Sequence, residues 1–329
     1  MQSKIITNKM VQKYVSIEDV IECVENTWRW YGEKQVIMPS KITTDMSSAG
    51  VNGWFNSMPS YIHPIGSAGI KVVGGYSDNP SKGLPFIRAN LLLTDPCNGD
   101  LRALICGDWI SDARTGAQPA VAMKYLAAKT DVLTMVGAGR QAYYAVECIR
   151  RVHKLKEVRV CDIRPEAREK FASYFPDADF RITPYESIEK ACEDADVIIT
   201  LTTADAVLVE EPWCKRGCLV MPMGSFHEVD DEIARKFDKL YLDNIAQGMH
   251  RGQFLNMAHA GEITEDSFDA ELPDVVAGLK SGREHADERI ICQLVGMGCP
   301  DLAVATLAYN RITEAGEDVV AVDMMGEYL

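Results

Sequence analysis

The pattern of hydrophobic and polar positions changes along the chain. Residues 17–31 (IEDVIECVENTWRWY) place apolar side chains on one face of a helix, and Ser16 suits its N-cap. From about 36 to 108, short β-rich runs such as GIKVVGGY and FIRANLLLTD alternate with turn signals, which predicts a mostly antiparallel sheet. Residues 112–128 then favour a helix, in which Pro119 either produces a kink or lies in the first turn.

The middle of the chain alternates β-type runs with helical stretches, which predicts a parallel sheet covered by helices. The runs are VLTMVG, VRVCDI, DVIITLTT, CLVMPMG and KLYLDN, with helices expected over 140–153 and near 165–174, 185–193 and 230–237. After Asn244 the pattern becomes more helical. The end segment PDLAVATLAYNRITEAG has a strong apolar face, so we expect a final helix that returns to the first domain.

These patterns predict an α/β protein with two domains. We expect a Rossmann-type parallel-sheet domain over 119–300. We expect a discontinuous α+β domain over 1–118 and 301–329, closed by the C-terminal helix.

Composition narrows the classes of function. The chain has 329 residues, 47% of them hydrophobic and 25% charged, which is typical of a soluble globular protein. A net charge of −14 disfavours nucleic acid and anionic membranes as partners. The N-terminal MQSKIITNKMVQKY has no uninterrupted apolar region, and no apolar run approaches the roughly 18 residues of a membrane span. We therefore expect a cytoplasmic protein without a signal peptide.

The ten cysteines are scattered, and we expect them to be reduced thiols. The closest pair, Cys214 and Cys218, has no second pair or histidine cluster beside it. The spacing is therefore weak evidence for zinc, and we expect no metal site.

The sharpest local signal is VLTMVGAGRQA, in which Gly137, Gly139 and Ala142 fit G-x-G-x-x-A between a strand and a helix. Gly137 permits a tight turn, Gly139 lets the backbone approach a pyrophosphate, and Ala142 permits close helix–strand packing. The helix N-terminus then faces the phosphates with its partial positive charge. The alternative is a glycine turn in an α/β domain that binds something else.

Asp162 ends the following strand, 23 residues after Gly139, near the spacing of about 20 expected for the acid that holds the ribose hydroxyls. An acid there repels a 2′-phosphate, so we favour NAD(H), with NADP(H) as the alternative because Arg164 lies close by. Later strand ends belong to the same predicted crevice, unless they are ordinary β–α turns. The further residues expected to contact the cofactor are Thr115, Ala138, Arg140, Gln141, Thr202, Thr203, Ala204, Gly224, Ser225 and Gly296.

At this point the sequence resembles a known family. VGAGRQAYYAVECI is similar to the GAGVQA segment of ornithine cyclodeaminase/mu-crystallin proteins. Further segments resemble that family in order: MPSK (38–41), NSMPSYI (56–62), GIKVVGGYSDNPSKGLP (69–85), LTDPCNGDLRALICGDWISDARTGA (93–117) and LVGMGCPDLAVA (294–305). The resemblance implies a substrate-binding and dimerisation domain beside a nicotinamide domain, a homodimer, and hydride exchange at the α-carbon of a small amino acid or its imine.

The resemblance also implies that basic side chains hold the substrate carboxylate. Lys41 matches the basic position of the family's P-x-R segment, Lys71 its central-strand lysine, and Arg114 its A-R-T arginine. Of the three, only an arginine can bind a carboxylate bidentately. The alternative is that Lys41 and Lys71 are solvated surface lysines. The apolar run GIKVV disfavours this for Lys71, because a lysine in a buried strand is costly unless it is paired or functional.

The sequence departs from the family after the glycine at 224. Ornithine cyclodeaminases carry a catalytic aspartate shortly beyond it, whereas this chain reads GSFHEVDDEI, with Phe226 or His227 at that place. Asp230 and Asp231 resemble the start of the next helix. His227 is a candidate for proton transfer because imidazole groups in general suit acid–base chemistry near neutral pH, and Lys71 is the other candidate. The alternative for His227 is a loop histidine without chemistry.

Three functions are therefore compatible with the sequence. The first is an oxidoreductase that uses NAD(P)(H) and acts on a small amino acid, cyclic imine or opine. The second is an ornithine cyclodeaminase that forms proline and ammonia with catalytic NAD. The third is a ligand-binding protein like mu-crystallin. The missing aspartate favours the first over the second, and the basic clamp disfavours the third.

Overall fold

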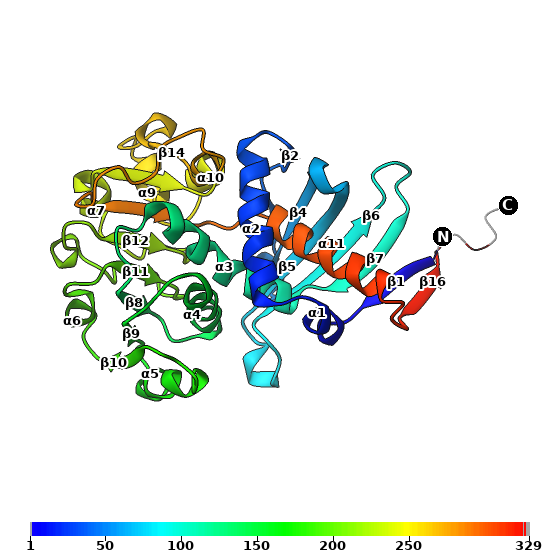
Figure 1. The fold of residues 1–329 in the computed structure, drawn as a ribbon, viewed down its shortest axis with the longest axis horizontal. Coiled ribbons are helices and arrows are strands. Elements are labelled where there is room, and N and C mark those ends of the chain that lie inside the picture. Colours follow the sequence, from blue (N-terminus) through cyan, green and yellow to red (C-terminus); the bar gives the residue numbers. More distant parts are fainter. Residues whose placement is uncertain (1, 325, 327–329) are drawn as a thin grey trace. The chain divides into compact units, whose positions relative to one another are not determined.

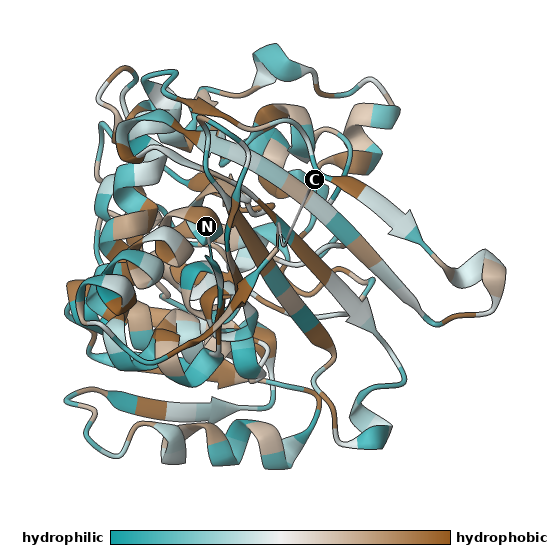
Figure 2. Cartoon of the chain, turned by 90° about the vertical axis from the view of Figure 1, so that its right-hand side faces the viewer, coloured by the Kyte–Doolittle hydropathy of each residue, from teal (hydrophilic) through white to brown (hydrophobic). Residues whose placement is uncertain are grey.

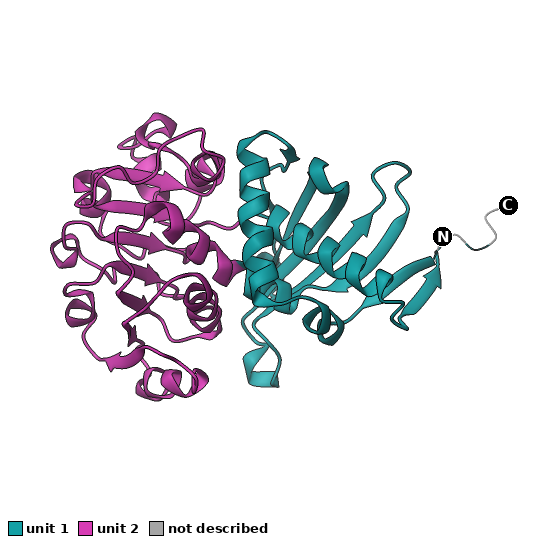
Figure 3. Cartoon of the chain, viewed as in Figure 1, with its two compact units in different colours: residues 1–114, 297–329 teal, residues 115–296 magenta. Residues whose placement is uncertain are grey.

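The computed structural model describes residues 2–324 and 326, which form two compact units. Unit 1 comprises residues 1–114 and 297–329, and unit 2 comprises residues 115–296 (Figure 3). The sequence placed the corresponding boundaries at 118/119 and 300/301. Helix α3 (Asp108–Leu126) contains the boundary between the units, and Pro119 lies inside it rather than in its first turn.

Unit 1 is built on an eight-stranded sheet of order β16-β1-β7-β6-β5-β4-β2, with β3 paired to β4. Most pairs are antiparallel, as predicted, but β1 runs parallel to β7. The strands are β1 (Gln2–Ile6), β2 (Val36–Ile37), β3 (Ile42–Asp45), β4 (Gly53–Ile62), β5 (Ser67–Tyr76), β6 (Ile87–Thr94), β7 (Leu101–Cys106) and β16 (Val320–Asp323).

Helices cover one face of this sheet. Helix α1 (Asn8–Tyr14) is followed by α2 (Ile17–Gly32), and α11 (Cys299–Glu314) packs on α2, β4, β5 and β6 (Figure 1). Ser16 caps α2 in a capping box with Asp19, which confirms the predicted helix start. Trp28 on α2 is fully buried. The apolar side chains of α11 thus complete the core of unit 1, as the sequence predicted.

Unit 2 contains an all-parallel sheet of order β10-β9-β8-β11-β12-β15-β13-β14. The strands are β8 (Val132–Val136), β9 (Glu157–Cys161), β10 (Arg181–Tyr185), β11 (Val197–Thr200), β12 (Leu219–Pro222), β13 (Lys239–Leu242), β14 (Ala270–Glu271) and β15 (Ile290–Gln293). The helices are α4 (Arg140–Val152), α5 (Pro165–Phe171), α6 (Ile188–Cys192), α7 (Asp231–Lys236), α8 (Ile245–Gly248), α9 (Leu255–His259) and α10 (Leu272–Val276).

Two features of unit 2 were not anticipated. Strand β10 precedes α6, and β15 inserts between β12 and β13 although the sequence after Asn244 reads as mostly helical. The run IICQ of β15 is short and buried on both faces, and such a run cannot be told from a helix segment by its periodicity.

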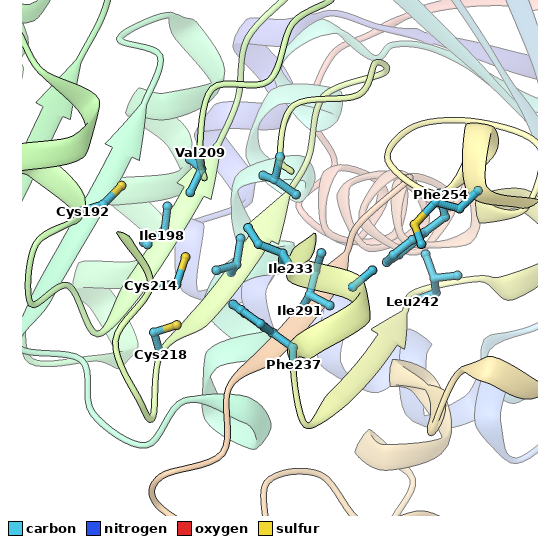
Figure 4. Close-up of a cluster of buried hydrophobic side chains, with 14 of the residues drawn as sticks. Cys192, Ile198, Val209, Cys214, Cys218, Ile233, Phe237, Leu242, Phe254 and Ile291 are labelled. Atoms are coloured by element: carbon cyan, nitrogen blue, oxygen red, sulfur yellow. The ribbon is translucent and has the colours of Figure 1, made fainter. Parts of the chain in front are cut away.

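The core of unit 2 contains apolar side chains from several of its strands and helices. Figure 4 shows part of this cluster, including Ile198, Ile233 and Phe237, with the thiols of Cys214 and Cys218 among them. The Cys214 thiol donates to the backbone carbonyl of Glu210 at 3.7 Å. In the described part of the chain, no three His, Cys, Asp or Glu side chains are grouped to hold a metal ion.

Candidate dinucleotide and substrate sites

The strand order of unit 2 reverses between β8 and β11, because the chain runs from β8 out to β10 and then returns to β11. Open parallel sheets bind ligands outside the carboxyl ends of their strands at such a switch point. The glycine-rich turn follows β8 and residues 201–204 follow β11, so the predicted cofactor segments flank this point. A Cβ atom on Gly137 would lie 2.5 Å from the carbonyl oxygen of Leu201, which shows how closely the two turns approach.

The glycine-rich turn has the conformation that the motif requires. Gly137 has φ +107°, a region that side chains disfavour. Gly139 occupies the N-cap position of α4, and apart from its immediate neighbours in sequence no atom of the described chain lies within 4 Å of the place its Cβ would take. Open space at Gly139, directly before the positive end of a helix, fits the close approach of a pyrophosphate. The residues present therefore fit a dinucleotide.

Asp162 follows β9 and reaches back to this turn. Its Oδ2 accepts the backbone N–H of Ala138 at 2.9 Å, and its Oδ1 accepts from the backbone N–H and the Nε of Arg164. Burial opposes ionisation, but these hydrogen bonds hold the pKa of the Asp162 carboxyl below its usual range. The carboxylate is thus ionised at neutral pH and stands beside the turn, as a ribose-binding acid should.

A pocket of about 820 Å³ opens beside this turn, entirely within unit 2. That volume lies within the usual range of about 300–1,000 Å³ for small-molecule sites. Ala138, Gly139, Arg140 and Arg164, all expected to contact the cofactor, line it. Three tyrosines add aromatic surface that the sequence analysis did not single out, namely Tyr143, Tyr144 and Tyr174.

Glu228 organises the two later strand ends. Its fully buried carboxylate accepts from the Thr200 hydroxyl at 2.8 Å and from the backbone N–H of Gly224 at 2.8 Å. Its other oxygen accepts from the backbone N–H and the hydroxyl of Thr202, at 2.9 and 2.6 Å. A Cβ on Gly224 would lie 2.3 Å from the Glu228 carboxyl carbon, so a side chain at this position would displace the carboxylate. One carboxylate therefore ties the turn after β11 to the turn after β12.

Asp243 is a second buried carboxylate that binds backbone N–H groups of a turn after a strand. This fully buried residue follows β13 and accepts the backbone N–H groups of Val295 and Gly296 at 2.9 and 2.8 Å. Gly296 has φ +81°. Asp243 therefore fixes the turn after β15 that contains a predicted cofactor-binding glycine.

The remaining predicted cofactor residues occupy varied places in unit 2. Thr115 and Gln141 lie in α3 and α4 and are half-buried. Ala204 donates its N–H to the Thr202 hydroxyl at 3.1 Å, which compacts the turn after β11. Thr203 and Ser225 are exposed in the turns after β11 and β12.

Unit 1 brings two of the three predicted basic residues together. Lys71 Nζ, on β5, lies 2.6 Å from Asp301 Oδ1, and Arg114 Nε, on α3, lies 2.8 Å from Asp301 Oδ2. Lys71 also donates to the Ser111 hydroxyl at 2.8 Å and is only 1% exposed. Lys71 is therefore not a solvated lysine.

Burial lowers the pKa of the Lys71 ammonium to about 8, with Arg114 acting in the same direction and Asp301 opposing both. An amine that titrates near neutral pH suits a general acid or base. Lys41 lies directly before β3 and is half-buried.

The three acids that closely follow Gly224, namely Glu228, Asp230 and Asp231, all accept hydrogen bonds or form ion pairs. Asp230 is the N-cap of α7 and accepts the N–H of Glu232, which confirms that it begins a helix. His227 Nε2 lies 2.8 Å from Asp231 Oδ1. Glu228 is the buried bridge described above.

Three carboxylates were missed as site residues: Glu228, Asp243 and Asp301. A signal for Asp301 was present, because an acid in the first turn of the apolar helix LAVATLA is costly to bury without a partner. Glu228 and Asp243 each follow a strand or its turn, but only the fold shows which amides they accept.

No helix in the described part of the chain combines the length and apolarity of a membrane span.

The chain is similar to known proteins over most of its length. Residues 1–316 match the model of the Ornithine cyclodeaminase/mu-crystallin family. An alanine dehydrogenase of Archaeoglobus fulgidus is 32% identical over 318 residues, 94% of this chain and 95% of that protein. An archaeal alanine dehydrogenase dimer with bound NAD superposes with a TM-score of 0.92 at 30% identity, covering 98% of this chain and 100% of that one.

A second solved structure is similar over the same length. The Δ1-pyrroline-2-carboxylate reductase of Thermococcus litoralis, in complex with NADH and L-proline, has a TM-score of 0.90 at 31% identity. The alignment covers 98% of this chain and 100% of that chain.

Proposed function

Because the chain belongs to the ornithine cyclodeaminase/mu-crystallin family, we propose that it is an NAD(H)-dependent oxidoreductase that reduces the imine of a small amino acid, or runs the reverse oxidation. The observation that carries this proposal is the buried Lys71–Asp301–Arg114 cluster in unit 1, in a chain whose unit 2 has a complete dinucleotide turn. Relatives named alanine dehydrogenase and Δ1-pyrroline-2-carboxylate reductase support this class of reaction.

The proposed roles divide between the units. Unit 2 holds the dinucleotide through the turn at Gly137 and Gly139, with Asp162 at the ribose, and the bound reduced nicotinamide supplies the hydride. Unit 1 holds the substrate carboxylate through Arg114, assisted by Lys41. NADP(H) is the disfavoured cofactor because Asp162 is ionised, although Arg164 beside it reduces the repulsion.

Lys71 is the proposed proton donor. Its ammonium gives one proton to the imine nitrogen and is left as a neutral amine, while the α-carbon receives the hydride and the C=N bond becomes a single bond. The low pKa of Lys71 favours this transfer. His227, hydrogen-bonded to Asp231, is the alternative donor.

We also propose that the protein is a homodimer joined through the sheet of unit 1. Paired positions on the face opposite the helices form an apolar row that crosses six strands: Val320, Ile5, Leu104, Leu92, Ile70 and Pro59. Val320, Ile5 and Leu104 are 65%, 40% and 39% exposed. Figure 2 shows hydrophobic segments within these strands. A contiguous apolar face of this kind favours a protein partner, and a related alanine dehydrogenase is a dimer.

Nicotinamide absorbance with purified protein tests the reaction. NADH is supplied with a panel of cyclic imines, and with 2-oxo acids plus ammonia or amines. Net consumption of NADH supports the proposal and identifies the substrate class. Formation of proline and ammonia from L-ornithine, with no net change in NADH, would instead establish the cyclodeaminase.

A further inference from the structure

A buried carboxylate in unit 1 contacts both cations to which the proposed reaction assigns a role. Asp301 lies in the first turn of α11 and is fully buried. Each of its oxygens serves one cation, Oδ1 facing Lys71 Nζ at 2.6 Å and Oδ2 facing Arg114 Nε at 2.8 Å. Strand β5 and helices α3 and α11, which are far apart in sequence, meet at this carboxylate.

The position of Asp301 favours a carboxylate. The N-terminal turn of a 16-residue helix carries partial positive charge, which stabilises an anion there. Two buried cations side by side repel each other, and removing them from water is costly. An anion between them offsets both effects. Asp301 meets that need with one oxygen for each cation: Oδ1 accepts a hydrogen bond from Lys71, and Oδ2 forms an ion pair with Arg114.

The surroundings of the Lys71 ammonium combine apolar, polar and charged groups. Its neighbours across the sheet, Met58 on β4 and Leu91 on β6, are apolar. Ser111 on α3 accepts a hydrogen bond from its ammonium but carries no charge. The charged groups that act on its pKa include Arg114 and Asp112 on α3 and Asp301 on α11, and Asp301 forms an ion pair with it at 2.6 Å.

We propose that Asp301 is a positioning residue of the reaction: it holds Lys71 as an ammonium ion aimed by a fixed hydrogen bond, and it orients the Arg114 guanidinium through Nε. The catalytic consequence rests on the function proposed above. The claim about the charge state of Lys71 does not depend on that function, because the charge state can be measured without substrate or cofactor.

The test is an NMR titration of the intact protein carrying ¹³Cε-labelled lysine. Lys71→Met identifies the Lys71 signal by its loss. Asp301→Asn keeps the size of the side chain and removes its charge. Removing an opposite charge at ion-pair distance shifts a pKa by about 1–3 units, so Lys71 is expected to titrate at least one unit lower in Asp301→Asn than in the wild-type protein.

Thr306→Val is the matched control. Thr306 is buried on the same helix, where its hydroxyl is hydrogen-bonded to Ser67 at 2.6 Å and to the Leu302 carbonyl at 2.9 Å. Losing these bonds destabilises α11 without changing the charge beside Lys71. The Lys71 titration is therefore expected to stay at the wild-type pH in this variant, even where thermal unfolding occurs earlier.

Two results would overturn the inference. One is a Lys71 pKa that is the same in Asp301→Asn and in the wild-type protein. The other is a wild-type Lys71 that titrates below neutral pH, a measurement that does not require Asp301→Asn to fold. If the titration shifts as expected but no imine is reduced by the wild-type protein, the proposed function fails and the inference about Lys71 stands.

Discussion

Replacing Glu228 with glutamine should weaken dinucleotide binding, although Glu228 lies beneath the turns rather than at the proposed cofactor surface. The carboxylate accepts four hydrogen bonds, from the hydroxyls of Thr200 and Thr202 and from the backbone N–H groups of Thr202 and Gly224. In glutamine, an NH₂ group replaces one acceptor oxygen. Whichever way the amide is turned, that NH₂ faces one hydroxyl and one backbone N–H.

The expected loss of NADH affinity follows from the hydrogen bonds that Glu228→Gln breaks. A hydroxyl can rotate and accept from the new NH₂, but a backbone N–H cannot, so at least one hydrogen bond to a charged group is lost. Such a bond contributes about 1.5–3 kcal/mol. Because about 1.4 kcal/mol corresponds to a tenfold change in affinity, displacement of either turn should raise the Kd for NADH roughly tenfold or more.

Calorimetric titration with NADH measures the effect, and Glu157→Gln is the matched control. Glu157 is also buried in unit 2 and accepts from Arg159, Arg181 and Thr183, but it begins β9, at the opposite end of the strands from the cofactor turns. Both variants should unfold at a lower temperature, and only Glu228→Gln should lose NADH affinity. Equal NADH affinity in the two variants would refute the role given to Glu228.

Four further outcomes are expected. Gly139→Val should abolish NADH binding in calorimetry with little change in Tm, because its side chain enters space that the described chain leaves open. Asp162→Ala should weaken NADH more than NADPH, and an equal loss would contradict the ribose role. Burial lowers the pKa of Lys71 to about 8, so kcat/KM for imine reduction should fall as pH rises through about 8 and the acid loses its proton; a profile flat to pH 10 would exclude Lys71 as the donor. Leu104→Asp should halve the mass seen by light scattering, and an unchanged mass would place the dimer interface elsewhere.

The sequence predicted the features that depend on local pattern. The cap at Ser16 confirms the predicted start of α2, and α11 packs in unit 1 as its apolar face indicated. The glycine-rich turn was predictable because φ +107° at Gly137 and the tight fit around it leave few alternatives to glycine. Each of these features is determined by residues that are close together in the sequence, so the local pattern is enough to predict it.

The features that the sequence did not reveal depend on residues distant in the chain. Asp301 pairs with Lys71 across 230 positions of sequence, and Asp243 binds amides 52 and 53 residues away. Strand β15 is recognisable only once β12 and β13 are in place to flank it. The three basic residues were expected to converge on a substrate anion, whereas the structure shows that two of them already share a carboxylate of the protein.

Transfer of deuterium tests the proposed reaction most directly. NADH carrying deuterium at both C4 positions of the nicotinamide is incubated with the protein and the imine that the absorbance panel identifies, and the product is analysed by mass spectrometry. The account predicts one NADH oxidised per amino acid formed, with deuterium at its α-carbon. A product without deuterium at the α-carbon, or product formation without net oxidation of NADH, would contradict it.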